Sequence, residues 1–285
     1  MSPLLVCCGL ATLDVVQVVD RVPGADEKVV ARSVDVTFGG PAANAAATAV
    51  ALGVRTVLVT ALGVGSVADI VRAGLVAAGV EVVDLAPGPG SPAVSTVLVT
   101  RATGERAVVS VNATGTADLR EPPADLLEDA TTLLVDGHHL RAAHVLARAA
   151  RARGIPVLLD GGSWKPGLDR LLAHVDHAVL SADFALPGGG GLEDVLTLGP
   201  SLVAQSAGSG PVRVLRVGRP AEVLQPPTVA AADVVDTLGA GDVLHGATAA
   251  ALATGQDVLT ALREGVVRAS ESVRHRGALG WVYEV

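Results

Sequence analysis

The chain has 285 residues, of which 50% are hydrophobic and only 2% are aromatic, and its 29 acidic and 21 basic residues leave a net charge of −8. This length and apolar content suit one large α/β fold with a sizeable core. The negative charge disfavours nucleic acid or an anionic membrane as a partner, and the shortage of aromatic side chains argues against a base-stacking surface.

The first predicted element is a buried strand at 4–8 that contains Cys7 and Cys8. Two adjacent cysteines provide neither a disulfide framework nor a metal site, so we interpret them as small buried thiols in a reducing compartment. No basic region precedes this strand, and no apolar run in the sequence approaches the roughly 18 residues that span a bilayer. We therefore expect a cytoplasmic protein that does not bind membranes.

Beyond this strand, short β-branched runs alternate with helical patterns, which is typical of a mostly parallel sheet covered on both faces. Further buried strands are predicted at 56–60, 80–85, 132–136, 156–160, 177–181 and 201–205. Helices are predicted at 41–53, 66–79, 139–153, 240–254 and 256–276. The sequence contains no repeat or interdomain linker, and the run 187–191 is interpreted as a flexible loop before a helix.

Two segments depart from this alternation. Residues 13–36 and 93–111 carry no convincing helical pattern and alternate apolar with polar side chains, so we expect β-structure that projects from the main sheet. A two-stranded ribbon is marginal in water, and such a segment needs either its own domain or a second subunit to pack on. We expect Val97 to lie on the outer face, where it would meet a neighbouring subunit.

Histidines follow the predicted strand at 132–136, namely His138, His139 and His144. They suggest a metal cluster, but no cysteine or carboxylate completes a tetrahedral set at a recognisable spacing, so zinc is not expected. The sequence also lacks the signatures of a P-loop, a dinucleotide-binding turn and a hydrolase nucleophile elbow.

The most informative run is Asp236-Thr-Leu-Gly-Ala-Gly-Asp242, which leads directly into the predicted helix at 240–254. Its two glycines let backbone N–H groups turn outward at a helix N-terminus, where free donors and the helix dipole favour an anion. A carboxylate at such a place suits a base that takes the proton from an attacking hydroxyl while the N–H groups hold a transferring phosphoryl group. The alternative for Asp242 is an ordinary helix N-cap.

This run resembles the signature of the PfkB family of carbohydrate kinases. A second run, Thr37-Phe-Gly-Gly-Pro-Ala-Ala-Asn44, resembles the family's N-terminal Gly-Gly-x-x-x-Asn element, and the two follow the family's order about two hundred residues apart. The resemblance implies a ribokinase-like fold, that is, a three-layer α/β/α domain over residues 1–285 with a mostly parallel sheet and a small β lid formed by 13–36 and 93–111. It also implies ATP-dependent phosphorylation of a primary hydroxyl of a small carbohydrate.

The resemblance assigns roles to individual residues. Asp242 is the expected base, and the backbone of Gly239, Ala240 and Gly241 the expected phosphoryl site. The expected sugar contacts are Asp14, Asp26, Gly39, Gly40, Asn44, Arg106, Asp136 and, close by, Asn112. The expected nucleotide contacts are Ser206, Gly208, Gly210 and Thr237. Turn or capping chemistry is the alternative for Asp14, Asp26 and Asn112, and a solvated lid position is the alternative for Arg106.

The metal site is left open by the resemblance. Many relatives carry Asn-x-x-Glu after the strand that corresponds to 177–181, to organise Mg²⁺ through water, whereas this chain has Ser181 and Phe184 there. Asp183 could substitute in part, or the nucleotide phosphates and water could hold the ion. Lys165, beyond the strand at 156–160, is a candidate for a phosphate contact.

The identity of the sugar stays open as well. Pro41 stands where some relatives place a polar side chain near the substrate, and fructose, ribose, another ketose or a keto-deoxy sugar acid all fit, with ketohexoses slightly favoured by Asp14, Asp26 and Arg106. The alternatives are a nucleoside kinase, disfavoured by the scarcity of aromatic residues, and a catalytically weak sugar-binding protein with the kinase fold. The family's lid also implies a homodimer.

Overall fold

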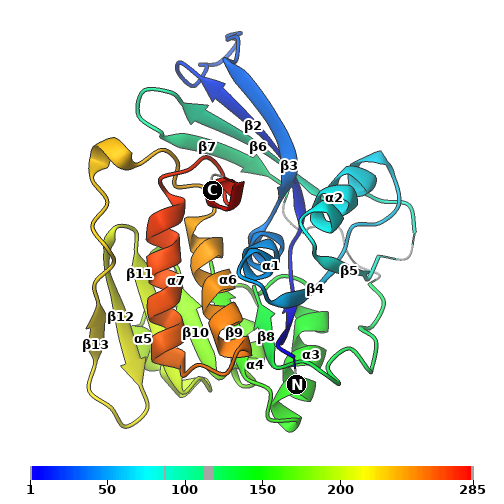
Figure 1. The fold of residues 1–285 in the computed structure, drawn as a ribbon, viewed down its shortest axis with the longest axis vertical. Coiled ribbons are helices and arrows are strands. Elements are labelled where there is room, and N and C mark those ends of the chain that lie inside the picture. Colours follow the sequence, from blue (N-terminus) through cyan, green and yellow to red (C-terminus); the bar gives the residue numbers. More distant parts are fainter. Residues whose placement is uncertain (1, 87, 112–118, 284–285) are drawn as a thin grey trace.

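A computed structural model describes residues 2–86, 88–111 and 119–283 (Figure 1). Two sheets make up its β-structure: a large central sheet of nine strands and a smaller sheet of four strands. In Figure 1 the smaller sheet lies above the carboxyl ends of the central strands, and helices cover the central sheet in front and behind. The predicted three-layer α/β/α architecture with a small β lid is confirmed.

The central sheet has the strand order β13-β12-β11-β10-β9-β8-β1-β4-β5. The strands from β11 to β5 are parallel to their neighbours, and β12 and β13 are antiparallel. Their bounds are β1 Leu4–Cys8, β4 Arg55–Thr60, β5 Glu81–Asp84, β8 Thr132–Val135, β9 Val157–Gly161, β10 His177–Leu180, β11 Leu202–Ala207, β12 Gly210–Arg216 and β13 Glu222–Leu224. The predicted strands agree to within one or two residues at each end, but the hairpin formed by β11 and β12 was not predicted.

One helical layer contains α1 Pro41–Ala51, α2 Ser66–Ala77, α6 Ala240–Ala253 and α7 Val258–Ser272. The opposite layer contains α3 Leu140–Ala152, α4 Leu168–Leu172 and α5 Leu192–Thr197. The short helix α8 Gly280–Tyr283 and the 3-10 turn Ala231–Asp233 complete the helical elements of the described residues. The five predicted helices are present. Four of them are one or two residues shorter than expected, and α7 is six residues shorter than the predicted 256–276, because the side chain of Asp257 caps its N-terminus and the helix ends at Ser272.

The core follows the alternation of the buried strands. In β1, Leu5 and Cys7 belong to the cluster under α1 and α6, whereas Val6 and Cys8 belong to the cluster under α3. Both cysteines are free, and burial raises the pKa of each thiol well above its usual range. They are therefore small buried apolar groups in this fold, as expected.

Helices α1 and α6 approach each other closely, because both are rich in alanine. A Cβ at Gly246 would lie 2.5 Å from the backbone oxygen of Ala45, so only glycine fits at this crossing. Small side chains thus take the place that aromatic residues fill in many cores, and the close approach brings the N-terminal ends of the two helices together.

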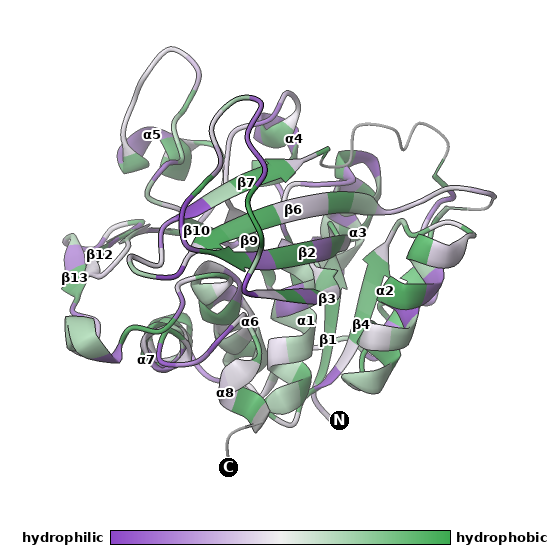
Figure 2. Cartoon of the chain, turned by 90° about the horizontal axis from the view of Figure 1, so that it is seen from above, coloured by the Kyte–Doolittle hydropathy of each residue, from purple (hydrophilic) through white to green (hydrophobic). Residues whose placement is uncertain are grey.

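The smaller sheet, called the lid below, has the order β3-β2-β6-β7. Its strands are β2 Thr12–Val19, β3 Ser33–Gly39, β6 Ala93–Thr100 and β7 Arg106–Ser110, so both segments predicted to project as β-structure do so. Figure 2 looks onto the lid and shows that β2 and β6 are largely hydrophobic.

The register of the lid corrects the prediction for Val97. Val97 pairs with Val16 and Val108 on the face that also carries Asp14 and Ser95, and it is only 2% exposed. Side chains alternate with a period of two along a strand, so the outer face belongs to the other set. That set includes Val34, Val36 and Val109, which are 63%, 48% and 74% exposed.

Among the described residues, no helix has the length and apolar character required to cross a bilayer.

Candidate active site

Helix α6 begins with an uncapped N-terminus. Gly239 occupies the cap position with φ 76°, and a Cβ there would lie 2.4 Å from the Cβ of Ala278, so the position requires glycine. The N–H of Ala240 donates to the carbonyl of Thr237 and that of Val243 to the carbonyl of Gly239, which leaves the N–H groups of Gly239, Gly241 and Asp242 without a partner among the described residues. Free donors at the positive end of a helix form an anion site.

Asp236 holds the loop before α6 in place. Its carboxylate accepts hydrogen bonds from the N–H of Leu238 at 2.8 Å and of Gly277 at 2.9 Å. The first acidic residue of the predicted signature therefore shapes the loop that presents the anion site, and the last one lies within the site.

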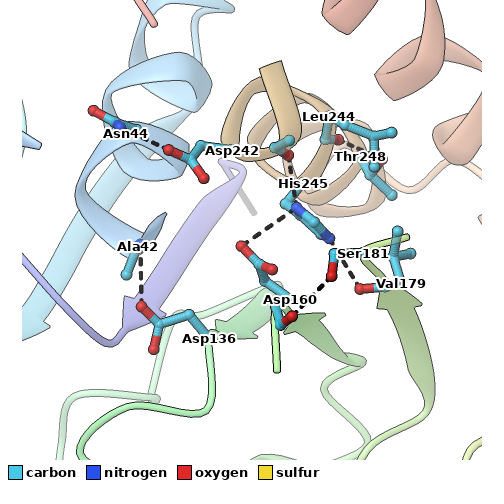
Figure 3. Close-up of polar contacts among 12 residues, drawn as sticks. Ala42, Asn44, Asp136, Asp160, Val179, Ser181, Asp242, Leu244, His245 and Thr248 are labelled. Atoms are coloured by element: carbon cyan, nitrogen blue, oxygen red, sulfur yellow. Dashed lines mark hydrogen bonds and ion pairs between the residues drawn. The ribbon is translucent and has the colours of Figure 1, made fainter. Parts of the chain in front are cut away.

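Helix α1 begins opposite this site. Gly40, its cap residue, has φ 97°, and a Cβ there would lie 2.5 Å from the carbonyl oxygen of Leu10. Asn44, on the first turns of α1, donates a hydrogen bond of 2.7 Å from Nδ2 to Oδ2 of Asp242 (Figure 3). Two predicted motifs that lie 198 residues apart in the chain thus meet through their side chains.

The electrostatics of Asp242 differ from those of a surface carboxylate. Burial and the neighbouring Asp160 raise the pKa of Asp242 to about 7, against the opposing effects of the Asn44 hydrogen bond and of His245. A carboxylate with such a pKa accepts a proton far more readily than an ordinary one near neutral pH, which is the property that a general base needs.

Two lid residues face the site. Asp14 accepts a hydrogen bond of 2.6 Å from Thr12, and burial raises the pKa of its carboxyl group, whereas hydrogen bonds from Thr12 and Ser95 lower it. A Cβ at Gly39 would lie 1.9 Å from Oδ2 of Asp14, so this carboxylate lies directly over the predicted glycine pair. Arg106 reaches from β7 to the hydroxyl of Thr237 at 3.5 Å and links the lid to the loop before α6.

Asp136 lies beneath the site and is engaged by the protein. It is 2% exposed, and its carboxylate accepts hydrogen bonds from the N–H groups of Leu10, Ala42 and His138 at 2.8, 3.2 and 2.8 Å. Burial alone would raise its pKa, but the nearby His138 and these hydrogen bonds lower the pKa of Asp136 to about 2. The residue expected to contact sugar therefore ties β1, α1 and β8 together.

No described contact links the remaining predicted site residues to the N-terminal ends of α1 and α6. Asp26 is exposed in the turn between β2 and β3, with a left-handed backbone of φ 56°. Ser206, Gly208 and Gly210 lie in the hairpin of β11 and β12, where the hydroxyl of Ser206 donates to the carbonyl of Leu180. Asn112 lies outside the described residues.

The structure adds a buried pair that was assigned no role from the sequence. His245, on α6, places Nδ1 3.3 Å from Oδ2 of Asp160 at the end of β9, and the two residues are 5% and 6% exposed (Figure 3). A histidine three residues beyond Asp242, within an otherwise apolar helix, was the signal that could have pointed to it.

The residues at the expected metal position do not fit a protein-held Mg²⁺. The hydroxyl of Ser181 donates to the carbonyl of Gly162, and Phe184 is buried against Trp164, with ring centroids 6.3 Å apart. Lys165 contacts Ser163 at 3.4 Å. Within the described ranges, no group of three or more His, Cys, Asp or Glu is placed to hold a metal ion. The histidine trio is divided, because His144 packs against His174.

Comparisons with known proteins show the family to which the chain is similar. Residues 2–281 match the family model described as pfkB family carbohydrate kinase. The chain is 26% identical to a ribokinase of Arabidopsis thaliana, over 98% of this chain and 78% of that one. It is also 32% identical to the bifunctional protein HldE of Pseudomonas putida. This match covers 77% of this chain and 48% of HldE.

Solved structures share the fold. The structure of Arabidopsis thaliana ribokinase complexed with ribose and ATP superposes with a TM-score of 0.78 at 23% identity and covers 100% of both chains. A nucleoside kinase of Methanocaldococcus jannaschii, described as an archaeal member of the ribokinase family, superposes with a TM-score of 0.77 at 16% identity, over 97% of this chain and 93% of that one. At these identities the likeness concerns the fold alone.

Proposed function

The chain belongs to the pfkB family of carbohydrate kinases, and from this premise we propose that it transfers the terminal phosphoryl group of ATP to a primary hydroxyl of a small sugar. Membership in this family makes it a sugar kinase, and its ribokinase relatives support the use of ATP. The observation that carries the proposal is the contact of Asn44 with Asp242 beside the free N–H groups of α6.

In the proposed reaction, the sugar lies between the start of α1 and the lid. Asp242 takes the proton from the attacking hydroxyl, whose oxygen forms a bond to the terminal phosphorus while the bond to the leaving diphosphate oxygen breaks. The N–H groups of Gly241 and Asp242, with the positive end of α6, stabilise the negative charge of the transferring group. Gly239 and Ala240 shape the turn that exposes these donors.

The sugar contacts proposed here are Asp14, Gly39, Gly40 and Asn44, with Asp26 from the lid turn. Carboxylates and an amide suit sugar hydroxyls, because they accept or donate hydrogen bonds in fixed directions. Asp136 is left out of this set, since three backbone N–H groups already engage its carboxylate.

On the nucleotide side, we propose Thr237, with Arg106 as its partner from the lid, and the hairpin turn that contains Ser206, Gly208 and Gly210. The arginine and the loop hydroxyl already touch, so closure of the lid over a sugar would place a cation beside the phosphates. Mg²⁺ is proposed to arrive with ATP, held by its phosphates and water, because the side chains of Ser181 and Phe184 are engaged elsewhere and the described residues contain no cluster of three or more His, Cys, Asp or Glu that could hold a metal ion.

The experiment that tests the function is a phosphorylation screen of the purified protein with MgATP. Ribose, fructose, other ketoses, keto-deoxy sugar acids and nucleosides are compared by ADP release and by detection of the phosphorylated product. We expect one class of sugar to exceed the others in kcat/KM. Preference for a nucleoside would assign the chain to the alternative activity. Tight sugar binding without any product would make it a binding protein.

We further propose that two copies associate through the outer face of the lid and that the protein works in the cytoplasm. The exposed valines Val34 and Val36 on β3 and Val109 on β7 lie on that face, along the two edge strands of the lid. An exposed apolar face between two open edge strands is protected by packing against another chain. Free buried cysteines are compatible with a reducing compartment.

A further inference from the structure

The ring of His245 is surrounded by acceptors. Nδ1 lies 2.6 Å from the carbonyl oxygen of Gly241 and 3.3 Å from Oδ2 of Asp160, and Nε2 lies 3.0 Å from the carbonyl oxygen of Val179. Figure 3 shows the ring between α6 and the strand ends that carry Asp160 and Val179. A carbonyl oxygen can only accept a hydrogen bond, so each ring nitrogen needs its own proton.

Burial favours a different proton arrangement. It raises the pKa of Asp160 to about 8 and lowers that of His245, which would move the shared proton to the carboxyl group. A neutral ring carries one proton, so it would present a lone pair either from Nδ1 to the Gly241 oxygen at 2.6 Å or from Nε2 to the Val179 oxygen at 3.0 Å, and the two acceptors would repel each other. The two carbonyl contacts therefore favour an imidazolium beside an ionised Asp160.

The Gly241 carbonyl belongs to the same peptide unit as the N–H of Asp242. Because a trans peptide is planar, its C=O and N–H point in opposite directions, and fixing one fixes the other. The N–H of Asp242 is one of the N–H groups at the start of α6 that have no partner among the described residues. A side chain that holds the Gly241 oxygen from within the helix layer thus adds to the helix's own hydrogen bonding in fixing the direction of a donor at the surface of the site.

We propose that His245, held by Asp160 and by the carbonyl of Val179, is a positioning residue that clamps the Gly241 carbonyl and aims the N–H of Asp242 at the transferred phosphoryl group. This inference rests on the proposed function. The positive ring also compensates the carboxylates around Asp242. The ionisable groups that face the pair are Asp242 on α6, Asp136 at the end of β8, and His138 and Lys165 beside Asp160.

The test compares two substitutions on the same helix. His245→Gln removes the clamp and its charge. Thr248→Val is the matched control. Thr248 lies one turn further along α6, is fully buried, and donates a hydrogen bond of 2.7 Å to the carbonyl of Leu244, four residues earlier, as His245 contacts the carbonyl of Gly241. We expect His245→Gln to lower kcat about tenfold or more, as for a misdirected oxyanion donor, with the sugar KM within about twofold. Thr248→Val is expected to stay within about twofold of the parent in both.

A pH profile separates positioning from simple loss of packing. His245→Gln removes a positive charge that lowers the pKa of Asp242, so the acid limb of kcat/KM should move to higher pH. Adding Asp160→Asn removes a neighbour that raises the pKa of Asp242 and should return the limb to lower pH, while kcat stays low because the clamp is still absent. Equal kcat values and unchanged pH limbs in His245→Gln and Thr248→Val would overturn the proposal.

The protonation state is measured in the parent protein without any activity assay. His138 also lies 3.3 Å from a buried carboxylate, that of Asp136, so the spectrum is recorded in a His138→Gln background as well as in the parent. In both proteins one ring is expected to show ¹⁵N signals of protonation at both nitrogens at pH 7.5, where exposed histidines are largely neutral. Absence of such a ring would overturn the inference even if His245→Gln failed to fold. A parent that phosphorylates none of the screened compounds but shows the doubly protonated ring would instead contradict the proposed function alone.

Discussion

At the scale of single residues, the hydrogen bond from Asn44 to Asp242 defines the centre of the site. Its donor is 8% exposed, and its acceptor has a raised pKa because it is buried near Asp160. An amide that holds one carboxylate oxygen leaves the other oxygen free to accept a proton. The geometry therefore fits a base that waits in a fixed orientation for its hydroxyl.

This base should be visible in the pH dependence of the reaction. Asp242 must be ionised to accept a proton, so activity should be lost as the pH falls through its pKa, which is raised to about 7. We expect kcat/KM to rise with pH and to level off above about 7.5. An acid limb below pH 5, where an unperturbed aspartate titrates, would show that a carboxyl group in another environment limits the reaction.

Asp136 provides a prediction for stability. The pKa of Asp136 is lowered to about 2 in the folded protein, whereas that of an unfolded aspartate is about 3.9. The ionised carboxylate therefore contributes its full stabilisation at pH values above about 3.9, and this contribution is lost as the pH falls toward 2. Asp136→Asn should therefore lower the free energy of unfolding by about 2 kcal/mol at pH 7, and by roughly half as much at pH 3. Denaturant titrations at both pH values measure this.

The control for that variant is Asp169→Asn, at an exposed position on α4. It makes the same chemical change without removing an acceptor from buried N–H groups, and it should alter the free energy of unfolding by less than about 0.5 kcal/mol. An Asp136→Asn protein as stable as this control at pH 7 would show that the three hydrogen bonds to Asp136 contribute little.

At the scale of elements, the lid carries a prediction about assembly. Val34 lies on its outer face and is 63% exposed, whereas Val97 is buried on the face that carries Asp14. Val34→Lys should weaken self-association at least tenfold, because it places a charge on the proposed apolar contact. Val223→Lys, at a 55% exposed valine of β13 in the other sheet, is the matched control. A parent protein that sedimentation finds monomeric at micromolar concentration would refute the dimer.

The segment after β10 carries a prediction about Mg²⁺. Ser181 is bonded to a backbone carbonyl and Phe184 is packed against Trp164, so neither serves as a ligand for the ion. Activity should require Mg²⁺ and should follow the concentration of MgATP, with no further activation when free Mg²⁺ is raised at constant MgATP. A second, saturable activation by free Mg²⁺ would reveal a protein site elsewhere.

The sequence predicted elements better than contacts. Buried strands such as 4–8 and helices such as 66–79 were recognisable from their apolar patterns. Glycine or charged residues at their ends marked where they begin and stop. The hairpin of β11 and β12 was missed, since β12 begins with Gly-Pro and mixes arginine with valine. Val97 was assigned to the wrong face, because alternation alone gives two faces without saying which one is covered.

At the scale of the whole molecule, the site depends on helices that the chain order separates. The starts of α1 and α6 meet because both pack on one face of the central sheet and approach closely through alanine and glycine. The two motifs were recognisable in the sequence, but the partners of Asp242 were not. Asn44 and Asp160 reach it from other elements, and no spacing along the chain encodes those distances. Likewise, the burial that gives Asp136 a structural role exists only in the folded protein.

The most direct test of the account is the turnover of Asp242→Asn, compared with Asp233→Asn, an exposed aspartate nine residues earlier in the chain. We expect Asp242→Asn to lower kcat by at least ~10²-fold, with thermal stability and calorimetric sugar affinity close to the parent, because only the base is lost. Asp233→Asn should retain the parent's turnover. Near-normal turnover by Asp242→Asn would remove this carboxylate from the mechanism and contradict the proposed reaction.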